Sequence, residues 1–369
     1  DYTDTSDGVL LLEKAATNFL TYSEDFSNGF WSKRGVSVVG GQVSPNGGTS
    51  AFKLVESSTT DIHKVFENFA LGITTGTVVT TSVYAKAGER SILKLQPYIG
   101  TKYIYVNFDL SNGTVGLTSG DEISKKIELL SNGYYRCSIT FLTDGTSVQT
   151  HLVLTDSNIA GVNPSYTGDG TSGIYIFGAM LEQNSVASSY IPTQGSASTR
   201  VAETASGSGN SEVFSDSQGV LFANIAANNK GGGYKLISIT DSTSGNSFVS
   251  IGMNNASTNS YKQIRFGGVN LFPDFIDPIN QTDFNKIAIK YKSGNSSFYV
   301  NGFEIDSSSV TYTPSAVMSE LKFSYFNGTD DFYGKTKEIG YYNTILTDLE
   351  LETLTSYRTW ESMVNELNL

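Results

Sequence analysis

Short runs that alternate apolar and polar residues recur along the chain, and clusters of Gly, Asn, Asp and Ser separate them. In the first 200 residues these runs include TVVTTSVYAKA, SILKLQPYI, KYIYVNFDL, YYRCSITFLT, HLVLTD and GIYIFGAMLE. Successive side chains of a strand point to opposite faces of a sheet, so this alternation predicts half-buried β-strands. Short strands between regular turn signals indicate an antiparallel sandwich or jelly roll.

The same pattern returns after a polar interruption. Residues 193–212, TQGSASTRVAETASGSGNSE, contain no aromatic residue and predict a linker, with a domain boundary near residue 205. Strand-like runs then resume in GVLFANIAA, SFVSIGM, KIAIKYK and SFYVNGFEID. We therefore predict an all-β protein with two tandem antiparallel jelly-roll or β-sandwich domains, residues 1–205 and 213–369.

The C-terminal segment has a helical rather than a strand period. Apolar residues follow one another at helical spacing, namely Leu351, Leu354, Tyr357, Trp360, Val364 and Leu367. Thr347 and Glu350 form a capping-box pair at the start of this segment. We expect one C-terminal amphipathic helix whose apolar face, including Trp360, packs on the second sandwich or on a neighbouring chain.

Composition excludes several functions. The formal net charge is −12, and the acidic excess is shared evenly between the two halves. Because no basic stripe is present, we expect no nucleic-acid binding, and because no long apolar run is present, we expect no membrane insertion. The single cysteine, Cys137, alternates with polar residues as a buried strand residue would, and His63 and His151 are isolated in sequence. A histidine-based metal site or catalytic triad is therefore disfavoured.

Three groups of neighbouring acids are candidates for catalytic groups. Glu304-Ile305-Asp306 resembles the start of the Glu-x-Asp motif of jelly-roll glucanases, but Ser307, Ser308 and Ser309 follow it and no third acid does. The triplet comes directly after Asn301-Gly302, a hairpin signal, so we expect two solvent-facing carboxylates on a hairpin strand. Asp330-Asp331 and Asp121-Glu122 lie in turn-like contexts and predict solvated loop acids. The chain is therefore predicted not to be an enzyme.

Tyrosines flanked by amides are the best candidates for sugar binding, since aromatic faces stack on pyranose rings while amides bond the hydroxyl groups. The stretch QPYIGTKYIYVNF contains five such candidates, namely Gln96, Tyr98, Tyr103, Tyr105 and Asn107. Alternation places Tyr103 and Tyr105 on one strand face, opposite Ile104 and Val106. Ordinary packing is the alternative for each tyrosine. In the second half, Tyr261 is the candidate, and we expect it to line the concave face together with Asn246 and Arg265.

The second half resembles the concanavalin A-like, laminin-G-like jelly roll from about Gly219 to Thr355. The resemblance lies in FNKIAIKYKSGNSSFYVNGFEID, in ELKFSYF and in KEIGYYNTILTDLELETL. It implies a sandwich that ends in a short helix. It implies no particular ligand, because this fold hosts lectins, adhesion modules and enzymes.

The first half resembles the carbohydrate-binding-module-like jelly roll of phage tail and other phage structural proteins. LLLEKAATNFLTYSEDFSNGFWSK, FDLSNGTVG, SNGYYRCSIT and the segment from SYTGDGTSG to GSASTR carry this resemblance in order. It implies a virion-associated, extracellular protein of a tail or tail fibre that meets other virion proteins. It also implies a homo-oligomer, with a trimer as the common form of tail fibres, and a structural role for Trp31 in the core.

Carbohydrate-binding relatives of this jelly roll often hold a structural Ca²⁺ between opening acids and an acidic pair in the last strand. Glu24 and Asp25 match the opening acids, but Phe177 and Gly178 stand where the pair is expected. Since Ca²⁺ needs six to eight oxygen ligands, this departure weakens the site. Glu24, Asp25 and Glu182 with backbone oxygens are the residues that could still hold the ion, and no other cofactor is predicted.

Three functions follow from these observations. The first is a noncatalytic virion protein, of a tail or tail fibre, whose lectin-like domains present a surface for host glycans. The second is a structural or decorating virion module that binds no sugar. The third, a polysaccharide depolymerase, is disfavoured because the third acid is missing.

Overall fold

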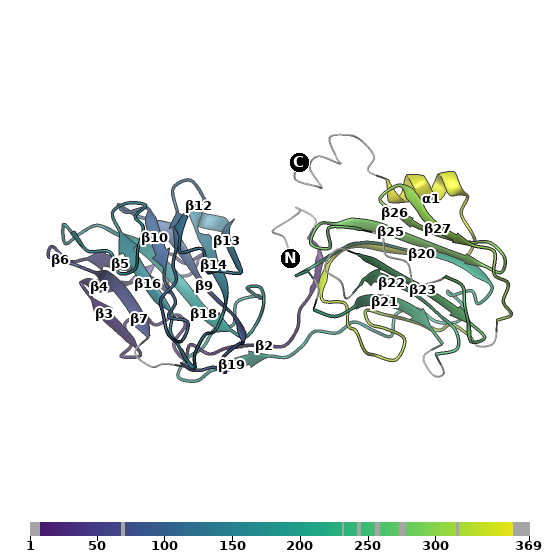
Figure 1. The fold of residues 1–369 in the computed structure, drawn as a ribbon, viewed down its shortest axis with the longest axis horizontal. Helices are drawn as coiled ribbons and strands as arrows, with labels where there is room; N and C mark the ends of the chain where they lie inside the picture. The colour runs from purple at the N-terminus through teal and green to yellow at the C-terminus, as the bar shows by residue number, and fades with distance from the viewer. Residues whose placement is uncertain are drawn as a thin grey trace. The chain divides into compact units, whose positions relative to one another are not determined.

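The computed structural model describes residues 8–67, 71–230, 232–241, 245–254, 259–272, 278–314 and 317–356 (Figure 1). The chain divides into two compact units. The first sandwich is Ala15–Val201, and the second sandwich combines Asp1–Lys14 with Ala202–Leu369. All pairings between the strands are antiparallel, as predicted for an all-β protein of tandem sandwiches.

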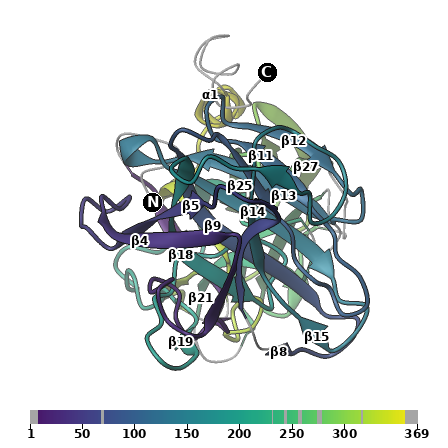
Figure 2. The same cartoon turned by 90° about the vertical axis from the view of Figure 1, so that its left-hand side faces the viewer.

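The first sandwich contains two six-stranded sheets. The β10 sheet has the order β12 (Thr114–Thr118), β11 (Val106–Asp109), β10 (Ile92–Leu95), β16 (His151–Thr155), β7 (His63–Glu67) and β3 (Trp31–Arg34). The β9 sheet, which can be followed in Figure 2, has the order β13 (Ser124–Leu129), β14 (Tyr135–Leu142), β9 (Val78–Ala87), β18 (Gly173–Glu182), β5 (Ala51–Glu56) and β4 (Val36–Gln42). Three short pairs complete it: β15 (Ser147–Val148) with β8 (Leu71–Gly72), β17 (Tyr166–Thr167) with β6 (Thr60–Asp61), and β19 (Ser198–Arg200) with β2 (Ala16–Asn18). A 3₁₀ turn, η1 (Ser131–Gly133), precedes β14.

Alternating residues of both sheets form one core between them. Leu93, Leu95, Val106 and Phe108 of the β10 sheet lie in the same buried cluster as Val79, Val83, Ile139 and Phe141 of the β9 sheet. Cys137 is fully buried in this cluster, as its alternation predicted. Trp31 is also buried there, and its indole nitrogen donates to the Tyr22 carbonyl at 2.7 Å, so the predicted structural role is confirmed.

The second sandwich also consists of two stacked sheets. The β20 sheet has the order β1 (Leu10–Leu12), β29 (Gly334–Tyr342), β20 (Gln218–Ala227), β25 (Asn285–Lys292), β26 (Ser296–Val300) and β27 (Phe303–Ser308). The β22 sheet has the order β24 (Val269–Asn270), β23 (Ser260–Phe266), β22 (Phe248–Met253), β21 (Lys235–Thr240) and β28 (Glu320–Lys322). Leu221, Ile225 and Ile287 share a buried cluster with Ile237, Val249 and Ile264, so the core lies between the sheets.

The predicted C-terminal helix is present as α1 (Asp348–Thr355), which lies on the outer face of the β20 sheet (Figure 1). The capping box forms as expected, since Glu350 N–H donates to Thr347 Oγ1 and Thr347 N–H donates to Glu350 Oε2. Leu351 is fully buried against Val220, Phe222, Ala288 and Tyr299. The other predicted helix residues, Tyr357, Trp360, Val364 and Leu367, lie outside the described residues. Among the described residues, no helix has the length and apolar character needed to cross a membrane.

The structure corrects the predicted domain boundary. Leu10–Leu12 forms β1 and pairs with Gly334–Thr336 of β29, so the start of the chain belongs to the second sandwich and not to a domain spanning 1–205. The expected linker, 193–212, is also tied down: Ser198–Arg200 pairs with β2, and Leu321 N–H donates to the Ser208 carbonyl at 2.8 Å. Sequence reasoning failed here because a segment rich in Gly and Ser can bond through its backbone without any apolar signal.

Candidate functional site

The outer face of the β10 sheet carries polar and aromatic residues. Leu93 and Leu95 point into the core, so Lys94 and Gln96 take the opposite face of the same chain segment. By the same alternation, Asn107 on β11, His151 on β16 and Lys64 on β7 lie on this face, because Val106, Leu152 and Val65 are core residues. Neighbouring strands therefore gather several hydrogen-bonding side chains on one surface.

A loop covers the middle of this face. The loop, residues 156–165, connects β16 to β17 and contains no regular secondary structure. Lys94 Nζ donates to the carbonyls of Ile159 at 2.9 Å and Gly161 at 2.5 Å. Asn107 Nδ2 donates to Asn158 Oδ1 at 2.8 Å and to the Ile159 carbonyl at 2.9 Å. These two buried side chains hold the loop against the sheet.

Gln96 and Asn163 form a reciprocal amide pair beside this anchor. Gln96 Nε2 donates to Asn163 Oδ1 at 2.9 Å, and Asn163 N–H donates to Gln96 Oε1 at 2.8 Å. Asn163 has a positive φ of 49°, a conformation that asparagine tolerates better than most residues. The pair fixes the end of the 156–165 loop.

Lys64 lies at the edge of the loop and contacts a histidine. Its Nζ donates to His151 Nδ1 at 3.2 Å and to Asn163 Oδ1 at 3.1 Å. Since Nδ1 accepts, the imidazole proton sits on Nε2, which donates to Gln149 Oε1 at 3.3 Å. Burial, and after it the charge of Lys64, lowers the pKa of His151 to about 3, so this histidine is neutral at physiological pH.

Half-buried aromatic rings surround Lys64 and His151. Tyr103 lies with its ring centroid 4.9 Å from that of Tyr98 and 5.0 Å from that of His151. Phe66 stacks on His151 from another side, with centroids 4.8 Å apart. We call Phe66, Tyr98 and Tyr103 the ring cluster. Partly exposed ring faces next to amide and ammonium donors are what pyranose binding requires.

The charge of this face is positive and uncompensated. Burial lowers the pKa of Lys94 to about 8, and burial with the charge of Arg34 lowers the pKa of Lys64 to about 8. Within the described part of the chain, no carboxylate forms an ion pair with either lysine. Both remain largely protonated at pH 7.

The structure brings together all five candidates of the first half, but in different roles. Gln96 and Asn107 are fully buried and bond the loop, while Tyr105 is 9% exposed and its ring lies 4.2 Å from Lys94 Nζ. Tyr98 and Tyr103 remain half-buried. Sequence reasoning missed Lys64, Phe66, Lys94, His151 and Asn163. The alternation in ILKLQ places Lys94 on the same strand face as Gln96, so the sequence did contain a signal for Lys94.

Tyr261 belongs to a separate cluster on the second sandwich. Its hydroxyl donates to Gln263 Oε1 at 2.7 Å, and Tyr325 donates to the same oxygen at 2.6 Å. The ring of Tyr234 lies 5.2 Å from that of Tyr261. Arg265 is on the same strand face, two residues beyond Gln263. The Asn246 carbonyl accepts from Gly268 N–H at 3.4 Å, which places Asn246 at the β23–β24 turn.

The candidate calcium ligands do not converge. Glu182 is fully buried and accepts from Ser188 N–H and Oγ at 2.9 and 2.7 Å. Burial raises the pKa of Glu182 despite these bonds. Glu24 accepts from the Tyr190 hydroxyl at 3.2 Å, and Asp25 Oδ1 accepts from Ser27 N–H at 3.1 Å. Over the described ranges, no three His, Cys, Asp or Glu residues gather as a metal site would need.

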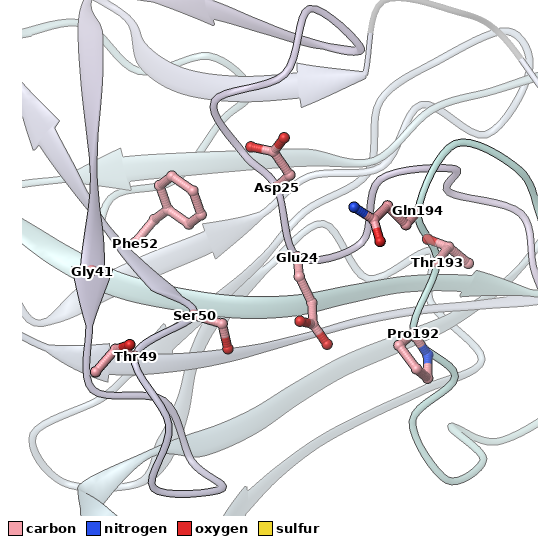
Figure 3. Close-up of a pocket in the computed structure, with 9 residues that line it drawn as sticks. All are labelled: Glu24, Asp25, Gly41, Thr49, Ser50, Phe52, Pro192, Thr193 and Gln194. Carbon is pink, nitrogen blue, oxygen red and sulfur yellow. The ribbon is translucent and has the colours of Figure 1, made fainter.

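Glu24 and Asp25 instead line a cavity of about 540 Å³ in the first sandwich. Figure 3 shows their carboxylates pointing away from each other, with that of Glu24 on the side of Ser50; Phe52 also lines the cavity. The remaining lining residues are Gly41, Thr49, Pro192, Thr193 and Gln194. Hydroxyl groups, an amide and one ring give this cavity hydrogen-bonding capacity, but it is distinct from the ring cluster.

The Glu-x-Asp triplet is a hairpin strand, as predicted, but one carboxylate is not solvent-facing. Asn301 and Gly302 have φ of 50° and 91°, which form the tight turn between β26 and β27. A register shift on β27 then places Glu304 opposite Tyr299 and Asp306 opposite Phe298. Glu304 accepts from the Tyr299 hydroxyl at 2.9 Å, whereas Asp306 pairs with buried Lys262 of the other sheet at 3.2 Å. The two acids therefore face opposite sides and cannot flank one bond.

The other acidic pairs form local contacts. Asp121 pairs with Lys102 at 3.0 Å and Glu122 with Lys125 at 2.6 Å. Asp331 accepts from the Tyr333 hydroxyl at 3.0 Å. Asp330 is exposed, as expected for a loop acid.

No family model and no curated protein matches this chain. Among solved structures, a NanB sialidase from Streptococcus pneumoniae is 20% identical with a TM-score of 0.33, over 41% of this chain and 28% of that chain. The CBM40 of Ruminococcus gnavus IT-sialidase, bound to α2,3 sialyllactose, is 18% identical with a TM-score of 0.34, over 38% of this chain and 83% of that chain. Mouse laminin α1 domains LG4-5 are 10% identical with a TM-score of 0.27, over 80% and 90%. The match to the NanB sialidase thus spans less than a third of that structure, and these similarities assign no ligand to this chain.

Proposed function

We propose that this protein is a noncatalytic carbohydrate-binding protein, and that the outer face of the β10 sheet is its glycan site. The observation that carries the proposal is the ring cluster. Phe66, Tyr98 and Tyr103 present partly exposed rings beside the amide of Gln149 and the ammonium of Lys64. Such a surface stacks on a sugar ring and bonds its hydroxyl groups.

The absence of catalysis is part of the proposal. Glu304 and Asp306, the best acid pair in the sequence, lie on opposite sides of their sheet. Retaining glycoside hydrolysis needs two carboxyl groups about 5 Å apart across one bond. Release of new reducing ends from a host polysaccharide would contradict this part.

The biological setting proposed here is a phage tail or tail fibre. It rests on the resemblance of the first half to phage structural jelly rolls. In that setting the protein is an extracellular virion component that contacts other tail proteins and host surface glycans. A homo-oligomer, with a trimer as the expected form, would multiply weak single-site binding through avidity. A structural Ca²⁺ near Glu24, Asp25 and Glu182 would need these carboxylates to move together with backbone oxygens, and calorimetric titration with CaCl₂ tests it.

Binding of the labelled full-length chain to an array of bacterial surface polysaccharides and host-type glycans tests the function. We expect specific binding that the double change Tyr98→Ala and Tyr103→Ala abolishes. The matched control is Tyr342→Ala, which removes an exposed tyrosine from the second sandwich. A blank array with folded protein would favour the alternative, a structural virion module whose rings contact neighbouring subunits.

A further inference from the structure

Two buried ammonium groups on the β10 sheet have no counter-ion among the residues that the structure describes. Lys94 is fully buried and Lys64 is 6% exposed, yet both donate to neutral groups, namely backbone carbonyls, an amide and a neutral imidazole. Removing a charge from water is costly unless an opposite charge accompanies it. In a protein of net charge −12, an unmatched positive pair on one face is an unusual arrangement.

Three acids of the strands and the loop at this face make other contacts, and one of them, Asp156 at the start of the loop, accepts from Ser157 Oγ at 3.0 Å. Asp109, at the end of β11, accepts from Ser111 Oγ at 2.6 Å and from Asn112 Nδ2 at 2.8 Å. Asp61 forms an ion pair with Arg34 at 3.0 Å. An anionic ligand would therefore meet two ammonium groups, while Asp109 and Asp61 already have partners of their own.

The position of Lys64 restricts where the acid group of that ligand must lie. Its Nζ is 4.7 Å from the centroid of Phe66 and 5.8 Å from that of Tyr103. A sugar stacked on either ring brings its own substituents within reach of Lys64. An acid group on the stacked sugar ring itself, as in a uronic or sialic acid, fits this distance, whereas one several residues along a glycan does not.

Polar side chains, rather than a packed apolar interface, hold the 156–165 loop on the sheet. Lys94, Asn107, Gln96 and Lys64 donate hydrogen bonds from the sheet to this loop. Ile159 and Val162 are exposed at 42% and 47% and add little apolar packing. Asn107 Oδ1 is buried without a hydrogen-bond partner, so a sugar hydroxyl that displaced the loop would also satisfy this oxygen.

We propose that the outer face of the β10 sheet selects acidic saccharides, with Lys64 pairing the carboxylate of the stacked sugar and Lys94 adding a second charge when the loop shifts. This inference rests on the proposed glycan-binding function and names its ligand class. The ligand carboxylate takes the place that Asn163 Oδ1 now holds beside Lys64. Lys64 and Lys94 are specificity-determining residues in this arrangement.

Matched probes test the charge requirement separately from sugar binding. Titration calorimetry would compare oligogalacturonate and sialyllactose with their carboxyl-reduced forms, which keep the ring and lose the acid. We expect the acidic forms to bind at least about 10-fold more tightly than the reduced forms, equivalent to about 1.4 kcal/mol. Raising the salt concentration should weaken only the binding of the acidic forms.

Two lysine variants and one control complete the test. Lys64→Gln should remove the preference for the acidic probe, and Lys64→Arg should restore most of it by keeping the charge. Lys126→Gln removes a 65% exposed lysine from β13 of the same sandwich and should change nothing. If Lys64→Gln fails to fold, salt dependence of the unmodified protein still tests the charge requirement, and Lys94→Gln tests its assignment to this face.

The outcomes separate the two proposals. Equal binding of acidic and reduced probes, lost in the Tyr98→Ala and Tyr103→Ala variant, would overturn the acidic specificity and leave the glycan function standing. No binding of any probe, here or on the array, would overturn both. Acid-dependent binding that Lys64→Gln leaves intact would place the anion elsewhere and overturn the assignment to this face.

Discussion

Arg90 holds the buried carboxylate of Glu56 with a bidentate pair of hydrogen bonds. Nε lies 2.8 Å from Oε2 and Nη2 lies 2.6 Å from Oε1. The Tyr166 hydroxyl and Asp169 N–H also donate to this carboxylate, at 2.6 and 2.8 Å. Burial acts to raise the pKa of Glu56, but these bonds outweigh it and lower the pKa. The cluster joins β5 to the segment that follows the 156–165 loop.

Glu56→Gln should destabilise the first sandwich by about 2–3 kcal/mol at pH 7, because Arg90 loses its ionised partner. The lowered pKa means that this stabilisation is present above the unfolded pKa of about 4.5 and is lost as the pH falls below it. Urea unfolding at pH 7 and at pH 3 should show the difference shrinking in acid. Glu89→Gln, which removes a 55% exposed partner of Lys53, is the control and should cost under about 1 kcal/mol.

Glu67→Gln should have the opposite effect. This side chain is fully buried, its Oε1 accepts from Thr150 N–H, and its Oε2 has no hydrogen-bond partner. Burial raises the pKa of Glu67 well above 4.5, so its contribution to stability is present below that pH and is lost as the pH rises. We expect the amide to raise the free energy of unfolding by on the order of 1–2 kcal/mol at pH 7, with little gain at pH 4.

The stability of the Glu67→Gln variant is measured by thermal unfolding across pH 4 to 8. Glu212→Gln, at an exposed position, is the control. An equal gain at every pH would mean that packing, not ionisation, carries the effect. A loss of stability at pH 7 would show that Glu67 is ionised and bonded in the folded protein.

Thr347→Ala should weaken α1. The threonine hydroxyl accepts from Glu350 N–H, and Glu350 returns a bond to Thr347 N–H. Loss of a helix N-cap costs about 1 kcal/mol. Hydrogen exchange of the α1 amides would speed up correspondingly, whereas Thr353→Ala, at an exposed position inside the helix, should leave exchange unchanged or slower.

Binding of acidic saccharides should weaken as the pH rises from 7 to 9. Lys64 and Lys94 each have a pKa lowered to about 8, so both lose their charge over this range. The other groups facing them keep their protonation: the pKa of His151 is about 3, and burial raises the pKa of Tyr103. Calorimetry with oligogalacturonate at pH 7, 8 and 9 measures this, and a pH-independent affinity would contradict it.

Local patterns in the sequence predicted much of the fold. Alternation identified the core residues of strands such as Val106 and Ile139, Asn301-Gly302 identified a hairpin, and Thr347 with Glu350 identified the start of α1. Each of these signals concerns residues that are close in sequence. The period of a strand or the chemistry of a turn determines such features without reference to the rest of the chain.

Features that depend on distant partners were not predicted. Leu10–Leu12 pairs with β29, which is far away in sequence, and nothing in the local pattern of Leu10–Leu12 predicts that partner. Asp306 faces Lys262 because of a register shift between Phe298 and Tyr299, which reverses the expected side. Tyr105 was predicted as a binding residue, but the neighbouring Lys94 and the loop that Lys94 bonds leave it 9% exposed.

The pairing of β1 with β29 suggests how separated fragments would behave. Residues 15–201 contain both sheets of the first sandwich and should fold alone, with the cooperative unfolding of a single domain. Residues 213–369 lack β1 and should expose the edge of β29, which favours self-association. Size-exclusion chromatography of both fragments measures this, and a monomeric, stable 213–369 fragment would contradict it.

The first sandwich is an insertion into the second, which constrains the order in which the chain can fold during synthesis. The first sandwich has all its strands once Arg200 has emerged from the ribosome, whereas β1 waits for Gly334 before its own partner exists. Until Gly334–Thr336 has been synthesised, Leu10–Leu12 has no strand to pair with. A stretching force applied across the second sandwich would also not pass through the first sandwich. The reason is that both chain connections of the first sandwich lead back to the second. The glycan site proposed on the first sandwich would therefore keep its shape while the second sandwich is under strain.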